Sequence, residues 1–185
     1  MKNIFSTIQF WALLLILASS CGDDIIPNES ELITSVYIQL VDTVQNDTIH
    51  ISFIDLDGSG GLPPVVVTPD LNAQTEYSAV ILLLNESLSP AINISDEVDA
   101  EKEEHQFFYS SSGTTILDIS YADQDANAYP LGAQFTLKSA QAGQTNLKVV
   151  LRHAPDKSAP GVSQGNIANA GGETDIEVDF NIIVR

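Results

Sequence analysis

IEVDFNIIV, residues 176–184, is the stretch that decides the fold expected for this chain. Apolar side chains fill every second position, and Glu177, Asp179 and Asn181 stand between them. Successive side chains of a β-strand point to opposite faces of its sheet, so this alternation predicts a strand with one buried face and one solvated face. Sheets with one solvated face are usually antiparallel.

The same alternation recurs along the chain, with glycine- and serine-rich turns between the runs. Further strands are predicted at residues 36–40, 49–53, 77–83, 117–121, 135–137 and 147–151, with an eighth at 105–109. Seven or eight strands, each with one polar face, predict an all-β domain. We expect one antiparallel, immunoglobulin-like β-sandwich over residues 33–185.

The helical candidate is the segment Ser95–Glu104, with Ser95 as its N-cap. Its only apolar residues are Val98 and Ala100, so we expect the helix to lie outside the core. The acidic run Asp96–Glu104 within it is typical of a solvated charged surface rather than of paired acid–base carboxylates.

The first residues of the chain have the layout of a secretory signal. Lys2 supplies a positive start, and the apolar run Phe10–Ala18 follows. This run is too short to span a membrane, which takes about 20 apolar residues. Small residues then lead to Cys21, the single cysteine of the chain. The pattern predicts a signal peptide over residues 1–20.

The segment LASSC, which ends at Cys21, resembles a bacterial lipobox. Ala18 stands where a lipobox usually has Leu, a relaxed form found in Bacteroidetes lipoproteins. The resemblance implies lipid on Cys21, and two or more acyl chains anchor a protein durably. The alternative is an ordinary secreted protein with a lone thiol.

Residues 21–32 are predicted to form a flexible acidic tether behind the lipidated cysteine. Gly22-Asp23-Asp24 resembles the export signal that sends Bacteroidetes lipoproteins to the cell surface. This implies a lipid-anchored outer-membrane protein on the cell surface, and the alternative location is the periplasmic face of that membrane.

Four further segments resemble, in order and spacing, a family of small flavobacterial lipoproteins. These segments are EEHQFFY (103–109), YADQDAN (121–127), LRHAPDK (151–157) and NAGGETDIEVDF (169–180). Members are commonly labelled type 1 periplasmic binding fold superfamily proteins. That label denotes two doubly wound α/β lobes, whereas this chain predicts strands almost throughout. The resemblance implies a cellular location but no enzymatic activity.

Charge and motifs exclude several classes of function. Seven Lys and Arg against 25 Asp and Glu give a formal charge of −18, which argues against nucleic acid as a partner. Gly161-Val162-Ser163-Gln164-Gly165 matches the hydrolase pattern G-x-S-x-G, but that mechanism needs a later histidine and none follows His153. We therefore expect no enzymatic activity.

Two aspartate-rich loops resemble calcium loops, in which side chains at alternate positions converge on one ion. The first contains Asp55 and Asp57, and the second contains Asp123, Asp125 and Asn127. Both lack the glutamate that completes an EF-hand. The alternative is a pair of Asx turns, in which the side chains bond to their own backbone.

His105 and His153 are candidates for a zinc site, because two histidines and a carboxylate suit such a metal. Each lies at a predicted strand end beside carboxylates: Glu103 and Glu104 in one case and Asp156 in the other. The alternative is that each histidine fixes a loop through a backbone hydrogen bond. The third histidine, His50, is expected to be exposed.

These features lead to three expectations for function. The first is a non-enzymatic binding or accessory module that partners an outer-membrane transporter, such as a TonB-dependent receptor. The second is a lipoprotein that binds calcium or a transition metal such as zinc. The third is a structural or adhesion protein of the cell surface.

The lipid anchor can be tested by replacing its attachment site. Cys21→Ala removes the only thiol that can carry the lipid, so we expect the protein to move from the membrane fraction to the soluble fraction on cell fractionation. Unchanged fractionation of the variant would end the lipoprotein interpretation.

Overall fold

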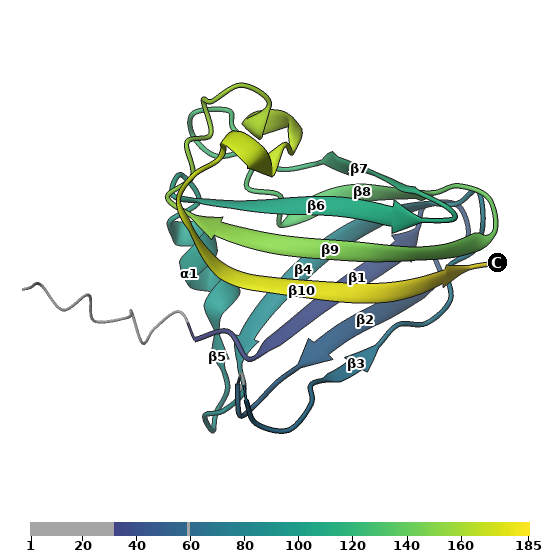
Figure 1. The fold of residues 1–185 in the computed structure, drawn as a ribbon, viewed down its shortest axis with the longest axis horizontal. Helices are drawn as coiled ribbons and strands as arrows, with labels where there is room; N and C mark the ends of the chain where they lie inside the picture. Colours follow the sequence, from purple (N-terminus) through teal and green to yellow (C-terminus); the bar gives the residue numbers. More distant parts are fainter. Residues whose placement is uncertain (1–31, 59) are drawn as a thin grey trace, which may run out of the picture.

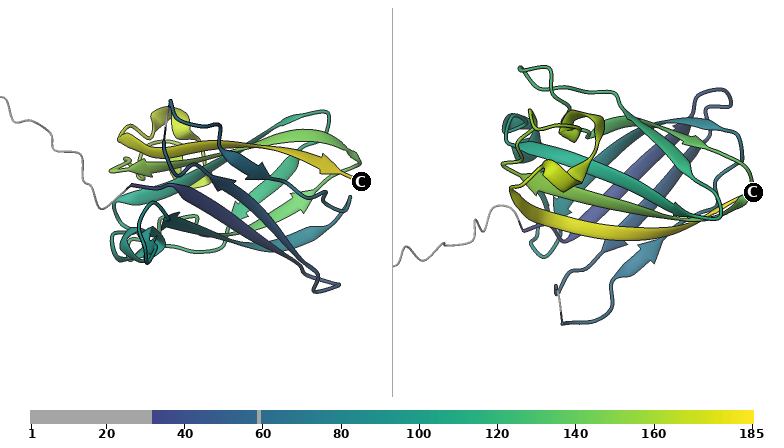
Figure 2. Two further views of the ribbon diagram at one scale, coloured as in Figure 1. Left: turned by 90° about the horizontal axis from the view of Figure 1, so that it is seen from below. Right: turned by 45° about the horizontal axis from the view of Figure 1, so that its top comes forward.

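The structure is a computed structural model that describes residues 32–58 and 60–185. The predicted signal peptide 1–20, the lipidation site Cys21 and the tether up to residue 31 lie outside the described residues. Two antiparallel sheets pack face to face, and Figures 1 and 2 show them from three sides. This is the all-β sandwich that the alternation predicts.

The larger sheet has seven strands, in the spatial order β3-β2-β1-β4-β8-β7 with β5 beside β4. Its strands are β1 (Ser35–Asp42), β2 (Thr48–Ile54), β3 (Val65–Val67), β4 (Glu76–Asn85), β5 (Ile92–Asn93), β7 (Leu117–Tyr121) and β8 (Gln134–Ser139). The smaller sheet has the order β10-β9-β6. Its strands are β6 (His105–Gly113), β9 (Gly143–His153) and β10 (Glu173–Val184). Every strand predicted from the sequence is present, and the short β3 and β5 are additions.

The alternation of β10 places its apolar residues in the core between the sheets. Val178 lies opposite Val149 of β9, and Phe180 lies opposite Leu147, all at most 2% exposed. Each fully buried side chain of this size contributes roughly 1.5–3 kcal/mol. The outward residues of β10 remain solvated, and Lys148 of β9 pairs with Glu177 there.

The helix α1 (Ile94–Ala100) is shorter than predicted and has a different cap. Asn93 is its N-cap, and the Asn93 side chain accepts a hydrogen bond from the Ser95 backbone at 3.2 Å. The Ser95 hydroxyl instead accepts from the backbone of Leu83 in β4. The expectation that the helix lies outside the core is wrong, because Ile94 and Val98 share one face and both are buried.

Residues 154–172 leave the smaller sheet after β9 and return to it at β10. They contain two 3-10 turns, η2 (Val162–Gln164) and η3 (Ile167–Asn169). Val162 and Ala170 pack on Phe108 and Val150 and form a second, small core. The G-x-S-x-G residues form η2 and its two glycine caps, so they do not make the strand-to-helix elbow of a hydrolase.

The ends of several strands and the helix α1 lie together at one end of the sandwich. β6 begins there, β9 ends there and β10 begins there, with α1 close by and residue 32 entering at the same end (Figure 1). The excursion 154–172 lies above it. Side chains from all three strands of the smaller sheet therefore meet at this end.

The turn into β10 gives a matched test of backbone conformation. Gly171 and Gly172 both have positive φ, 59° and 67°. A Cβ at Gly172 would overlap the carbonyl oxygen of His153, whereas a Cβ at Gly171 meets open space. We expect Gly171→Ala to cost about 1–2 kcal/mol from left-handed strain alone. Gly172→Ala should cost at least twice as much in thermal melting, and equal melting temperatures would contradict this account.

Candidate metal site at the end of the smaller sheet

His105 and His153 are direct cross-strand partners. They lie opposite each other at the ends of β6 and β9. Their ring centroids are 4.7 Å apart, and the rings meet edge to face at 83°. Two histidines that are distant in the sequence are thus brought together by one strand pairing.

Asp175 completes the group from the third strand. Thr174 pairs with Arg152 and Ile176 pairs with Leu151, so Asp175 is the extra residue of a β-bulge. A bulge re-aims a side chain, and here the carboxylate turns inward with its side chain only 9% exposed. Asp175 Oδ2 lies 3.8 Å from His105 Nε2.

The three side chains offer ligand atoms within 4.8 Å of one another. Within residues 32–58 and 60–185, no other group of three or more His, Cys, Asp or Glu side chains is this close. The residue pattern gives no sign of Asp175 as a ligand, because Asp175 occupies a position of the strand alternation that is expected to face solvent. Only the bulge reverses that position, and no residue type announces it.

The hydrogen bond of His105 fixes its tautomer. Its Nδ1 lies 3.1 Å from the carbonyl oxygen of Glu101, at the end of α1. A carbonyl only accepts, so Nδ1 carries a hydrogen, and in the neutral ring Nε2 is then the nitrogen that presents a lone pair. No hydrogen-bond partner for this buried Nε2 lies in the described part of the chain. The lone pair faces the Asp175 carboxylate.

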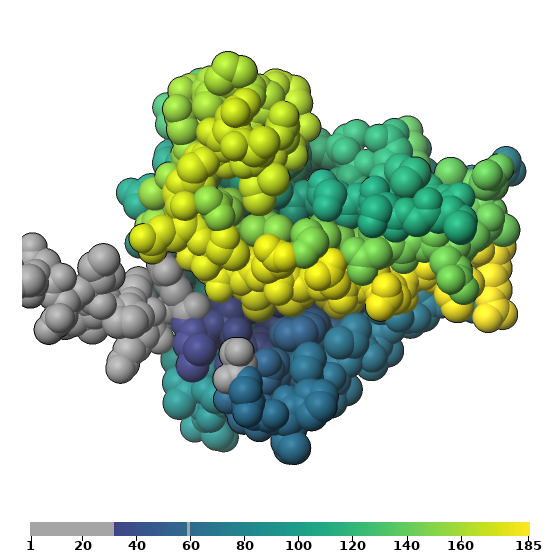
Figure 3. All heavy atoms as spheres, viewed as in Figure 1, coloured from purple at the N-terminus to yellow at the C-terminus, as the bar shows by residue number. Residues whose placement is uncertain are grey.

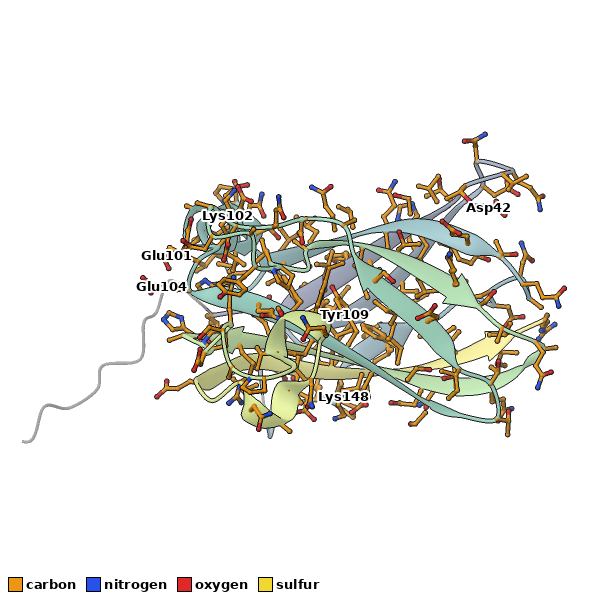
Figure 4. The ribbon with its side chains drawn as sticks, turned by 90° about the horizontal axis from the view of Figure 1, so that it is seen from above. Asp42, Glu101, Lys102, Glu104, Tyr109 and Lys148 are labelled. Carbon is orange, nitrogen blue, oxygen red and sulfur yellow. The ribbon has the colours of Figure 1, made fainter. Side chains whose placement is uncertain are left out.

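His153 has the opposite arrangement. Its Nδ1 is buried, whereas its Nε2 lies 3.9 Å from the carboxylate of Glu104. His153 is about one-third exposed and Glu104 two-thirds exposed, so this pair forms the solvent side of the site. Glu101 and Glu104 lie together at the end of the domain in Figure 4.

The other predicted zinc partners lie apart from the three-residue group. The Asp156 carboxylate accepts hydrogen bonds from the Ser158 hydroxyl and backbone, and these bonds lower the pKa of Asp156. Glu103 is exposed, and so is His50, as expected. Glu104 alone among the predicted carboxylates approaches a histidine of the group.

The loop of Asp123 and Asp125 is organised by backbone amides. Asp123 accepts hydrogen bonds from the amides of Gly132 and Gln134, at 2.6 and 2.8 Å. Asp125 Oδ1 accepts from the amide of Asn127 at 2.8 Å. These are the contacts of the Asx-turn alternative.

A lysine occupies the remaining oxygen of Asp125. Lys157 Nζ lies 2.9 Å from Asp125 Oδ2, and both side chains are at most 4% exposed. Lys157 also donates to the carbonyl of Lys102. An ammonium group therefore lies where a calcium ion would have to bind, and calcium at this loop gains no support from the contacts.

The loop of Asp55 and Asp57 has the same character. Asp55 accepts a hydrogen bond from the amide of Gly58, and Asp57 accepts one from the amide of Leu62, each at 2.9 Å. Residue 59 lies outside the described residues. Calcium at this loop stays a prediction.

Two tyrosines line a hollow between β7 and the excursion 154–172. The hydroxyl of Tyr109 donates to the carbonyl of Gly132, and that of Tyr121 donates to the carbonyl of Phe107. Burial raises the pKa of Tyr121 to about 12. Both hydroxyls serve as structural donors and stay protonated at neutral pH.

No protein-family model, curated protein or solved structure matches this chain. Among the described residues, no helix has the length and apolar character that a membrane crossing requires.

The buried pair Asp125–Lys157 provides a test of the turn interpretation. We expect Asp125→Asn and Lys157→Met each to lower the free energy of unfolding by about 3–5 kcal/mol, because each leaves an uncompensated buried group. The double variant should recover most of that loss. Urea unfolding at pH 7 measures all three, and a double variant as unstable as the sum of the singles would contradict the pairing.

The same pair has a pH dependence of known sign. Burial raises the pKa of Asp125, but hydrogen bonds from Lys157 and two backbone amides outweigh this and hold the pKa below its usual value. The contribution of Asp125 is therefore complete above about pH 3.9, its unfolded value, and is lost as the pH falls through the lower folded value. The stability difference between the wild-type protein and the double variant should shrink over that window.

Proposed function

We propose that this domain binds a transition-metal ion of the zinc class through His105, His153 and Asp175. The observation that carries the proposal is the convergence of two imidazoles and one carboxylate within 4.8 Å, from three adjacent strands. Two nitrogen ligands and one oxygen ligand suit zinc and related divalent metals, whereas calcium prefers oxygen ligands alone.

The surroundings of both histidines support this interpretation. A histidine that binds a metal usually directs its other ring nitrogen to a carbonyl or a carboxylate, which fixes the ring. Here the outward nitrogen of His105 meets the Glu101 carbonyl, and that of His153 faces the Glu104 carboxylate. The buried Nε2 of His105 faces the Asp175 carboxylate at 3.8 Å, and the buried Nδ1 of His153 lies on the same inner side of the group.

The ligand atoms have to approach one another when an ion binds. Bonds of about 2.0–2.2 Å place tetrahedral ligand atoms about 3.4 Å apart. The present limit of 4.8 Å is wider, so the Asp175 and His153 side chains have to move closer together when an ion binds. The three protein ligands leave a fourth position of a tetrahedral site for water or another ligand.

A bound cation would also relieve an electrostatic repulsion within the site. The lone pair of His105 Nε2 faces a carboxylate at 3.8 Å in a nearly buried position, and two acceptors repel each other at low dielectric. A metal that binds the folded protein alone stabilises it by an amount that rises with the logarithm of the metal concentration above the dissociation constant, which gives the proposal a direct test.

The partial exposure of His153 implies an exchangeable ion rather than one enclosed in the core. On the expected outer-membrane lipoprotein, such a site would capture metal from the surrounding medium. The transporter partnership and the absence of enzymatic activity stay predictions from the sequence and its resemblance.

Thermal melting with and without metal tests the proposal. We expect zinc at about 100 times its dissociation constant to add about 2.7 kcal/mol to the stability, relative to chelator. That corresponds to a rise of about 5–10 °C for a domain of this size. Calorimetric titration should give one site per chain.

Two variants and one control make this test specific. His153→Gln and Asp175→Asn should each abolish the zinc shift, whereas His50→Gln, at an exposed histidine, should keep it. Retention of the shift in both site variants would refute the site. A rise with calcium that Asp123→Asn removes would return the function to the aspartate loop.

A further inference from the structure

Exposed apolar side chains gather at the end of the larger sheet where the chain enters the domain. By strand pairing, β1 begins at this end, β2 ends there, β3 begins there and β4 ends there. β5 pairs with the last residues of β4. The exposed residues, which we name the apolar rim, are Leu32, Leu56, Leu62, Val65, Leu88 and Ile92.

Each side chain of the apolar rim is 47–76% exposed. Single exposed apolar residues are ordinary on a protein surface, but a cluster at one end indicates an interaction surface. Residues 60–67, in blue, project below β10 in Figure 3, beyond the cover of the smaller sheet. The apolar rim is therefore not an extension of the core.

Hydrogen bonds turn the acidic groups of the two loops of the apolar rim back onto the domain. Asp57 binds the amide of Leu62, and Asp55 binds that of Gly58. Glu86 accepts a hydrogen bond from the Tyr37 hydroxyl at 2.7 Å. The carboxylates are held by the loops, and the leucines are left to face outward.

The start of β1 lies between the two loops of the apolar rim, the loop after β2 and the loop after β4, as the views in Figures 1 and 2 agree. Cys21, the expected lipid site, precedes Leu32 by a stretch that spans at most about 40 Å when fully extended. A lipid on Cys21 therefore holds this end of the domain close to the membrane.

We propose that the apolar rim rests on the lipid bilayer surface to which Cys21 anchors the protein. Apolar side chains on a surface that is kept near a bilayer partition into the boundary between headgroups and acyl chains. The tether keeps the effective concentration of that surface high, so a few leucines are enough for a persistent contact. This inference rests on the predicted lipidation of Cys21 and does not depend on the metal site.

The acidic helix sets a condition on the lipid. Asp96, Glu97 and Glu101 of α1 and its C-cap lie at the same end of the domain. They repel anionic headgroups over about 10 Å at 0.1 M salt. The contact should therefore be strongest on zwitterionic lipid, and salt should strengthen it on anionic lipid.

The experiment uses an introduced tryptophan as the reporter of contact. The only tryptophan of the chain is Trp11, within the predicted signal peptide, so the processed protein has no competing signal. The processed protein, lipidated on Cys21 and carrying Leu88→Trp, is reconstituted in phosphatidylcholine vesicles that contain brominated phosphatidylcholine, a contact quencher. The matched control is Val44→Trp, an exposed position in the turn between β1 and β2 at the opposite end.

We expect at least twofold quenching and a blue-shifted emission for Leu88→Trp, and no change for Val44→Trp. Adding Leu56→Ser and Leu62→Ser to the Leu88→Trp protein should return its quenching to the control level. Replacing a third of the lipid by phosphatidylglycerol at low salt should reduce the quenching, and added salt should restore it.

Equal quenching at both positions would overturn the proposal, and so would a Leu88→Trp signal that the serine substitutions leave unchanged. Sedimentation of the protein in detergent that shows a dimer lost on the same serine substitutions would assign the apolar rim to a second copy instead. All of these variants should keep zinc binding, because none of them changes a residue of the metal site.

Discussion

The pairing of β9 with β6 on one side and β10 on the other is the constraint on which the rest of the structure depends. A slip of one residue would turn Leu147, Val149 and Leu151 from the core to solvent, so the register is fixed by the burial of apolar surface. The same register places His153 opposite His105. The candidate metal site is therefore a consequence of how the core packs, and its two histidines need no dedicated contact to meet.

The bulge at Asp175 is the local irregularity that turns a strand end into a site. It directs a carboxylate toward an imidazole nitrogen in a region from which water is largely excluded, where like acceptors repel. The excursion 154–172 begins directly after His153 and ends just before Asp175. An ion bound by both residues would close this excursion at its base and add to the small core of Val162 and Ala170.

The aspartate loops show that one residue pattern is compatible with two roles, cation binding and turn formation. Alternating Asp and Asn side chains present oxygens to a cation or accept their own backbone amides, and the spacing alone is the same for both. Lys157 decides between these two roles for Asp125, because its ammonium group pairs with the Asp125 carboxylate. Lys157 lies far along the chain and reaches this carboxylate only because the excursion 154–172 folds over it. The loop of Asp57 uses its turn to present Leu62 outward, which links the turn chemistry to the apolar rim.

The sequence by itself determined the strands, the antiparallel sandwich and the two candidate histidines, because alternation with period two and the residue types of strand ends are local properties. The sequence wrongly placed the helix outside the core. The predicted helix began at Ser95 and so left out Ile94, which supplies half of the buried face of α1. Only the tertiary structure decided which carboxylate joins the histidines, since a bulge depends on the pairing between strands and leaves no mark in the residue pattern. Likewise, only the order of the strands gathered the scattered leucines at the end where the chain enters, because their neighbours in space belong to different hairpins.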